Sequence, residues 1–372
     1  MNINLSKNLV LICALLLSAC DGRQGTTAGT TQALDKLDSQ TSRQVLAQME
    51  QVRRQYAEQS LLTIDDFGHK LHLFLQDPGE ERLDELRNSW LLAHNAFTRA
   101  SFFSFNDQSE IKNLIDAWPI QRGFIDSTSS HPQSGIINDL TLDINAETLR
   151  HQHGVTDSLE VSLGFHSLEF LIFDRKFSDY NAAITQNQEN APQDNPVETS
   201  KIQGNTEEIV GRRRQMLKIV FNILEQDLRQ GFISAEGSNA SLIADTNDGE
   251  HAKVDSIRLI LKRLLLPAQS LFAEVNYIGG KRSGHSGFSQ SSWENLRNQH
   301  SVLVELSGAG SMLAPILTLL DEKSASDYQI TLTQAQDILL LEEPDAEQFA
   351  RMPLLFAALG HQLEDMQTVM RY

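Results

Sequence analysis

Apolar residues recur every three to four positions along most of the chain from residue 32 onward, and few stretches alternate as strands do. This periodicity predicts an all-α protein. Pro267 falls inside one helical pattern and predicts a kink or a break there. The helices expected in the first half are 32–62, 65–75, 79–103, 109–117, 146–152 and 158–173, and those in the second half are 206–230, 251–277, 290–307, 311–321, 331–341 and 345–370.

A polar stretch at residues 178–205, rich in Asn, Gln, Asp and Pro, separates the two groups of expected helices. Each group has enough amphipathic segments to close a core of its own. We therefore expect two helical-bundle halves, 32–177 and 206–372, joined by a linker or excursion at 178–205. A second polar stretch, 234–250, is expected to be a loop between helices.

The N-terminus resembles a bacterial lipoprotein signal peptide, with Lys7 before an apolar core and Leu17-Ser18-Ala19-Cys20 at its end. Its nine apolar-rich residues are too few to span a bilayer. The resemblance implies removal of residues 1–19, lipidation of Cys20 and a flexible tether at 20–31. An ordinary secretory signal with an incidental cysteine is the alternative.

Such processing places the protein on the periplasmic side of a Gram-negative cell envelope, with the lipid bilayer as its partner through acylated Cys20. Asp21 resembles an inner-membrane retention signal, and the outer membrane stays open. Cys13, the other cysteine, lies in the signal, so the mature folded part has no disulfide, thiolate nucleophile or cysteine metal ligand. The formal net charge of −18 disfavours nucleic acid as a partner.

His166 and Glu169 stand three positions apart in an apolar helical run, so their side chains share one face. Imidazole and carboxylate together suit iron or zinc. The bare spacing also occurs by accident, and an ordinary surface or core-edge pair is the competing interpretation. A second copy, His361 and Glu364, lies in an amphipathic stretch that is typical of a solvated face.

Three segments together resemble the imelysin family of bacterial envelope proteins. The GxHxxE motif of 164–169 is the first, Asp116-Ala117-Trp118-Pro119 is similar to the family's Asp-x-Trp-Pro segment, and His285-Ser286-Gly287-Phe288-Ser289 is similar to a His-Ser-x-Phe-Ser stretch. The resemblance implies two related helical bundles, an exported and often lipid-anchored protein, and an association with iron-regulated or metal-uptake systems. It also makes His166 and Glu169 the metal or active site. His94 departs from the family, which commonly has arginine there, and could supply a second imidazole.

Three functions remain open at this point. The first is binding of a divalent metal, iron or zinc, or of a metal-bearing ligand, with Asp116, His94 and Glu160 as further ligands of His166 and Glu169 and with iron-uptake components as partners. The second is a metallopeptidase in which Glu169 is the general base, although no His-Glu-x-x-His is present. A serine hydrolase mechanism through Ser286 beside His285 has weaker support, because adjacency in sequence does not produce the nucleophile–base geometry. The third hypothesis is a structural or interaction protein with a degenerate site.

Overall fold

The computed structural model describes residues 39–104, 110–182, 196–245, 252–278, 285–342 and 344–369. Within these ranges the chain is built of helices, with no strand and a single isolated β-bridge between Thr128 and His131. The all-α prediction is confirmed. The helices are α3 (Ser39–Gln76), α4 (Glu80–Ser104), α5 (Glu110–Ile115), α6 (Arg122–Ile125), α7 (Ala146–Gln152), α8 (Gly164–Phe173), the 3₁₀ helix η1 (Phe177–Tyr180), α10 (Pro196–Asp245), α11 (Ala252–Ile278), α12 (Ser292–Ser307), α13 (Ala314–Leu320), α14 (Glu322–Leu339) and α15 (Ala346–Val369).

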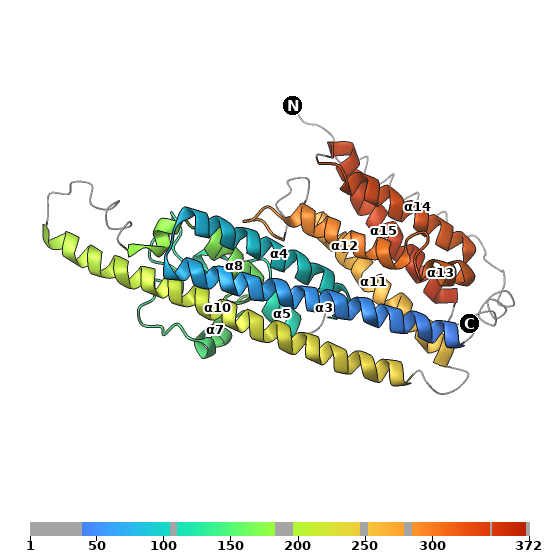
Figure 1. Ribbon diagram of the computed structural model, residues 1–372. Helices are drawn as coiled ribbons and strands as arrows, with labels where there is room; N and C mark the ends of the chain where they lie inside the picture. Colours follow the sequence, from blue (N-terminus) through green and yellow to red (C-terminus); the bar gives the residue numbers. More distant parts are fainter. Residues whose placement is uncertain are drawn as a thin grey trace, which may run out of the picture.

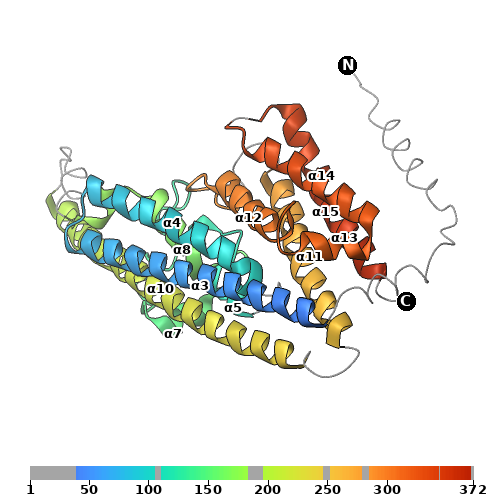
Figure 2. The ribbon, with the colours of Figure 1, turned by 45° about the vertical axis from the view of Figure 1, so that its right-hand side comes forward.

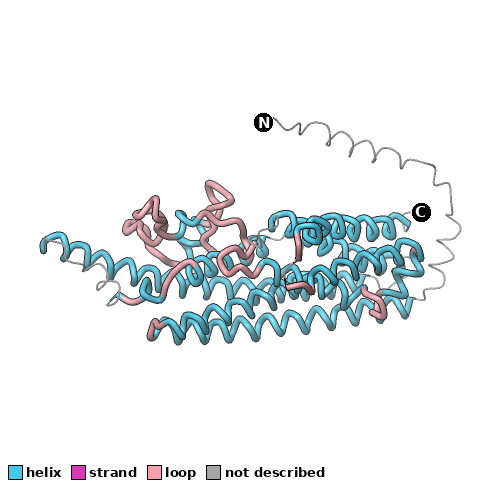
Figure 3. Tube along the Cα trace, turned by 90° about the horizontal axis from the view of Figure 1, so that it is seen from above, coloured by secondary structure: helices cyan, strands magenta, loops and turns pink. Residues whose placement is uncertain are grey.

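The first bundle consists of α3, α4, α8 and α10, which run side by side in Figure 1. Its core contains the buried apolar face of α4 and nearly the whole of α8, together with residues 216–232 of α10. The connecting segments between α5 and α8 gather along one side of this bundle, where Figure 3 shows most of the loops. α8 is therefore a central helix covered on all sides, which is why its residues from Gly164 to Ile172 are buried.

The second bundle consists of α11, α12, α14 and α15 with the short α13, and Figure 2 shows it beside one end of the first bundle. Its core also includes Val45, Leu46 and Met49 from the beginning of α3, whereas Ile64 and Phe67 of the same helix lie in the first core. A helix of 38 residues is about 57 Å long. α3 thus contributes to both cores, and α4 packs on α12 between them.

Two bundle halves are present, but the division between their cores lies elsewhere than expected. α10 starts at Pro196, inside the predicted linker 178–205, and packs in the first core because its apolar residues 216–232 face α3 and α8. The cores therefore separate between α10 and α11. The part of the predicted linker at 183–195 lies outside the described residues.

Several predicted boundaries are corrected by the structure. α3 is one helix through residues 63 and 64, because Ile64 continues its buried stripe. α10 continues to Asp245 through most of the polar stretch 234–250, with Ala235 still buried. α11 contains Pro267 without a break.

The predicted signal peptide 1–19, Cys20 and the tether 20–31 lie outside the described residues. Among the described helices, none combines the length and the apolar composition that crossing a bilayer requires.

Candidate metal centre

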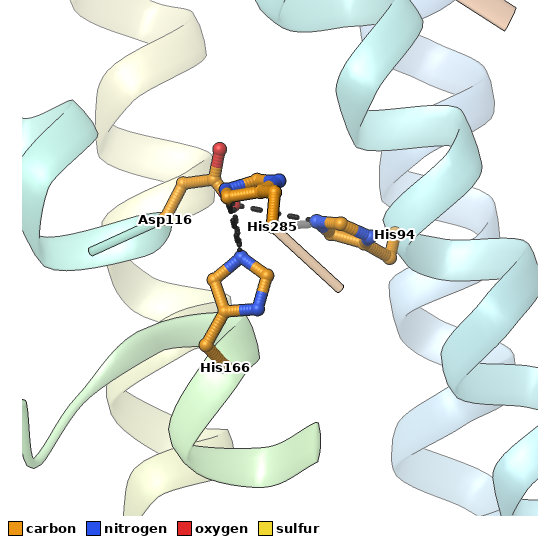
Figure 4. A group of neighbouring side chains, drawn as sticks. All are labelled: His94, Asp116, His166 and His285. Carbon is orange, nitrogen blue, oxygen red and sulfur yellow. Dashed lines mark hydrogen bonds and ion pairs between the residues drawn. The ribbon is translucent and has the colours of Figure 1, made fainter. Parts of the chain in front are cut away.

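Four side chains from separate parts of the chain converge on one point, as Figure 4 shows. His94 lies in α4, Asp116 follows the last residue of α5, His166 lies in the first turn of α8, and His285 precedes α12. One nitrogen or oxygen atom of each lies within 4.8 Å of the others, and this is the one group of its kind in the part of the chain that the structure describes.

The four donor atoms are close enough to be ligands of a single ion. Asp116 Oδ1 lies 3.3 Å from His94 Nε2, 3.1 Å from His166 Nε2 and 3.6 Å from His285 Nε2. His166 Nε2 lies 2.9 Å from His285 Nε2. Four ligands at about 2.1 Å from a metal in tetrahedral geometry are about 3.4 Å apart. Three imidazoles and one carboxylate also form a donor set that zinc and iron accept, so the residues fit a divalent transition metal.

Gly164 explains how α8 reaches Asp116. Its φ of +82° lies in the left-handed region, and a Cβ atom built on it would lie 2.5 Å from the carbonyl oxygen of Ile115 and 2.8 Å from that of Leu114. Only glycine permits both the conformation and the approach. The first turn of α8 therefore lies directly on the backbone that precedes Asp116, which brings His166 to the carboxylate.

The group is buried on one side and slightly open on the other. The side chains of His94 and His166 are 0% exposed, whereas those of Asp116 and His285 are 10% and 14% exposed. The less buried side of the group is thus the one formed by Asp116 and His285.

Glu169 lies outside the group of four, next to His166, and orients the His166 ring. Its Oε2 lies 2.8 Å from His166 Nδ1. Its Oε1 accepts from the backbone N–H of Phe288 at 3.1 Å, and from the backbone N–H and the hydroxyl of Ser289 at 2.8 and 2.7 Å. An acceptor at Nδ1 keeps the proton there and leaves Nε2 to face a metal. Glu169 also ties the segment that contains His285 to α8.

Burial opposes ionisation of Asp116, but His285, His166 and His94 outweigh it and hold the pKa of this carboxyl well below its usual range. Burial likewise disfavours a charged His166, yet hydrogen bonds to Asp116 and Glu169 raise its pKa to about 9. Burial and the neighbouring His166 lower the pKa of His285 to about 3. The positive charge of the group is thus carried by His166, between two carboxylates.

His94 has a second set of neighbours away from Asp116. Its ring stacks on Trp90 with centroids 4.8 Å apart, and burial lowers its pKa. Its Nδ1 lies 3.4 Å from Nδ2 of Asn295 in α12. A neutral imidazole whose ring is held by packing is suited to bind a metal through whichever nitrogen carries no proton.

Of the residues predicted from the sequence, the structure brings together His94, Asp116 and His166. Glu169 contacts His166 rather than the common point. Glu160 lies outside the group, because its carboxylate accepts from Thr156 and from the backbone of Asp157 in its own turn.

His361 Nδ1 lies 3.4 Å from Glu364 Oε2 on the surface, with side chains 79% and 48% exposed, so the solvated face predicted for them is confirmed. The ligand that sequence reasoning missed is His285. Its only signal was its place in the His-Ser-x-Phe-Ser stretch.

Glu274 of α11 is a further carboxyl at the edge of the group. Its Oε1 accepts from the backbone N–H of His285 at 3.4 Å, and burial raises its pKa to about 7.

Comparison with known proteins agrees with this fold and motif. The sequence model of the imelysin family, a family of M75 peptidases by its description, matches residues 52–230. Among proteins with curated descriptions, none matches this chain.

Two solved structures are similar in fold. A candidate iron-regulated protein A precursor from Parabacteroides distasonis ATCC 8503 has a TM-score of 0.60 and 14% identity, over 90% of this chain and 96% of that one. An imelysin-like protein from Psychrobacter arcticum 273-4 has a TM-score of 0.56 and 13% identity, over 90% of this chain and 94% of that one.

Proposed function

We propose that this chain is an imelysin-like protein that binds one divalent metal ion through His94, Asp116, His166 and His285, since residues 52–230 match the sequence model of the imelysin family. The convergence of three imidazole nitrogens and one carboxylate oxygen carries the proposal. Iron is the metal we favour, since a fold relative is described as iron-regulated, and zinc is its competitor.

The charges of the group support a divalent ion. Asp116 and Glu169 both have a lowered pKa and are ionised, and His166 is the one imidazole of the three with a raised pKa. One imidazolium balances one of the two negative charges. A divalent cation with three neutral imidazoles balances both, which matters because an uncompensated buried charge is costly.

We further propose that the protein acts in iron or other metal uptake at the periplasmic side of the envelope, anchored by lipidated Cys20. The lipobox-like Leu17-Ser18-Ala19-Cys20 and the polar tether support this placement.

The test is metal binding by the protein without an affinity tag. Anaerobic titration calorimetry with ferrous iron and with zinc should give one ion per chain. The variants His166→Ala and His285→Ala should each lose tight binding while the helical circular dichroism signal persists. His361→Ala, in the exposed pair, is the matched control and should bind as the wild type does. Equal binding by the wild type and both centre variants would refute the site.

A metallopeptidase is the alternative that the family description suggests. Hydrolysis would need a general base that can take a proton from a metal-bound water. Glu169 is not free for this role, because both its oxygens accept hydrogen bonds and its side chain is 0% exposed. The geometry therefore makes Glu169 an orienting residue and not the base of a hydrolase.

A further inference from the structure

Asn295 in α12 is a buried residue whose amide is only half satisfied. Its side chain is 0% exposed. Nδ2 donates to the hydroxyl of Ser286 at 2.7 Å and lies 3.4 Å from His94 Nδ1. Oδ1 has no hydrogen-bond partner among the described residues, although it is buried. No described residue therefore holds the amide in one orientation through this second atom.

The orientation of the Asn295 amide and the tautomer of His94 depend on each other. An amide N–H that points at Nδ1 requires a lone pair there, so the proton of the neutral ring is on Nε2. That proton points at Asp116 Oδ1, 3.3 Å away. A protonated nitrogen cannot bind a metal. As the side chains lie, His94 is therefore a hydrogen-bond donor to Asp116 and not a ligand.

We propose that Asn295 is a positioning residue which, by rotating its amide through half a turn, moves the proton of His94 from Nε2 to Nδ1 and so makes His94 a metal ligand. The inference rests on the proposed metal site. Rotation exchanges Oδ1 and Nδ2, so that Oδ1 accepts the His94 Nδ1–H. Ser286 serves both orientations, because its hydroxyl can accept from Nδ2 or donate to Oδ1.

The two buried histidines of the centre are thus oriented in different ways. Glu169 offers His166 an acceptor only, which holds one proton on Nδ1, so a metal would displace only the second proton of this imidazolium, the one on Nε2. Asn295 offers His94 either a donor or an acceptor. Asn295 also lies in the second bundle and His94 in the first, so the state of the His94 ring depends on a residue across the boundary between the cores.

The experiment compares Asn295→Asp, which is an acceptor only, with Asn295→Leu, which is neither donor nor acceptor. Asn298→Leu is the matched control, because Asn298 is one turn further along α12, is also buried and bonds to Arg99 instead of His94. The first readout needs no metal. Nitrogen-15 NMR of histidine-labelled, chelator-treated protein reports the tautomer of His94, assigned with a His94→Gln variant.

The wild type should show the Nε2–H tautomer of His94, and Asn295→Asp should show Nδ1–H. The second readout is zinc affinity by calorimetry. Asn295→Leu should bind about 10- to 100-fold more weakly than the wild type, as is usual when a partner of a metal-ligating histidine is removed. Asn295→Asp and Asn298→Leu should retain tight binding.

An Nε2–H tautomer in Asn295→Asp, or wild-type zinc affinity in Asn295→Leu, would overturn the role of Asn295. If the wild type binds neither zinc nor iron, the proposed function fails, and the tautomer of His94 in Asn295→Asp still decides the inference about Asn295. Should Asn295→Leu fail to fold, the aspartate variant and the NMR readout give the answer.

Discussion

Replacing Gly164 with alanine should destabilise the protein and separate His166 from Asp116. The added methyl group would meet the backbone of Leu114 and Ile115 at 2.5 to 2.8 Å, and backbone atoms cannot rotate away as side chains do. The left-handed conformation at φ +82° costs a non-glycine residue about 1–2 kcal/mol, and overpacking costs about 1–3 kcal/mol. The expected loss of unfolding free energy is therefore about 2–5 kcal/mol.

Urea unfolding followed by far-UV circular dichroism, with a chelator present, measures this loss. Gly211→Ala is the matched control, because Gly211 is exposed inside α10 and an added Cβ there meets nothing within 4 Å. That variant should gain about 0.5–1 kcal/mol from the better helix propensity of alanine. Zinc affinity should fall about tenfold or more in Gly164→Ala and stay unchanged in Gly211→Ala.

Two results would refute the reasoning about Gly164. Wild-type stability in Gly164→Ala would mean that α8 does not depend on its close approach to residues 114 and 115. A large loss of stability with unchanged zinc affinity would mean that this approach does not position His166 against Asp116.

Three further changes have definite expected outcomes. Asp126 is buried and forms an ion pair with Arg213. Burial opposes ionisation of this carboxyl, but Arg213 outweighs it and lowers the pKa of Asp126 in the folded protein. The ion pair therefore stabilises the fold above the unfolded pKa of about 3.9, and this contribution is lost as the pH falls through the lower folded pKa. Asp126→Asn should therefore cost about 3–5 kcal/mol at pH 7 in urea unfolding and less in acid, and an equal cost at both pH values would contradict the ion pair. Glu169→Gln should lose zinc affinity in calorimetry, because an amide whose oxygen accepts from the loop must turn its N–H toward His166 Nδ1; wild-type affinity would show that Glu169 does not orient His166. Cys20→Ser should release the protein from membranes or stall its processing in cell fractionation, and a normally cleaved variant that stays membrane-bound would place the anchor elsewhere.

The helices could be predicted where their apolar stripe is long and regular, as in α4. Helix ends were harder, because polar residues continue a helix whenever tertiary contacts hold it. Ala235 is buried in α10 beyond the point where the pattern turns polar. The start of α14 had a local signal, since Asp321 caps it by accepting from the backbone N–H groups of Lys323 and Ser324. The helix expected at 331–341 therefore begins nine residues earlier, at Glu322, and ends at Leu339.

The candidate site was predictable in part, because helical periodicity relates residues that are close in sequence and says nothing of contacts between distant segments. Helical spacing places His166 and Glu169 on one face, and the apolar flanks of α8 predict their burial. Spacing does not decide which of the two faces a metal. The choice between His166 and Glu169 is set by Phe288 and Ser289, which lie 119 and 120 positions after Glu169 in the sequence. Their backbone N–H groups donate to the Glu169 carboxylate and so keep it from facing a metal. His285 enters with the same segment, and no periodicity relates it to α8.

The centre depends on both bundles, and this has a physical consequence for its affinity. His94, Asp116 and His166 come from the first core, while His285 lies in the segment that leads into α12 of the second. A metal binds weakly to a ligand atom whose segment must first become ordered, because binding then bears the entropy cost of ordering that segment. The segment that contains His285 is already held in place, because Glu169 accepts three hydrogen bonds from residues 288 and 289. The carboxylate of the GxHxxE motif therefore assembles the site from two bundles and orients one imidazole within it, which accounts for its burial without requiring that it touch the metal.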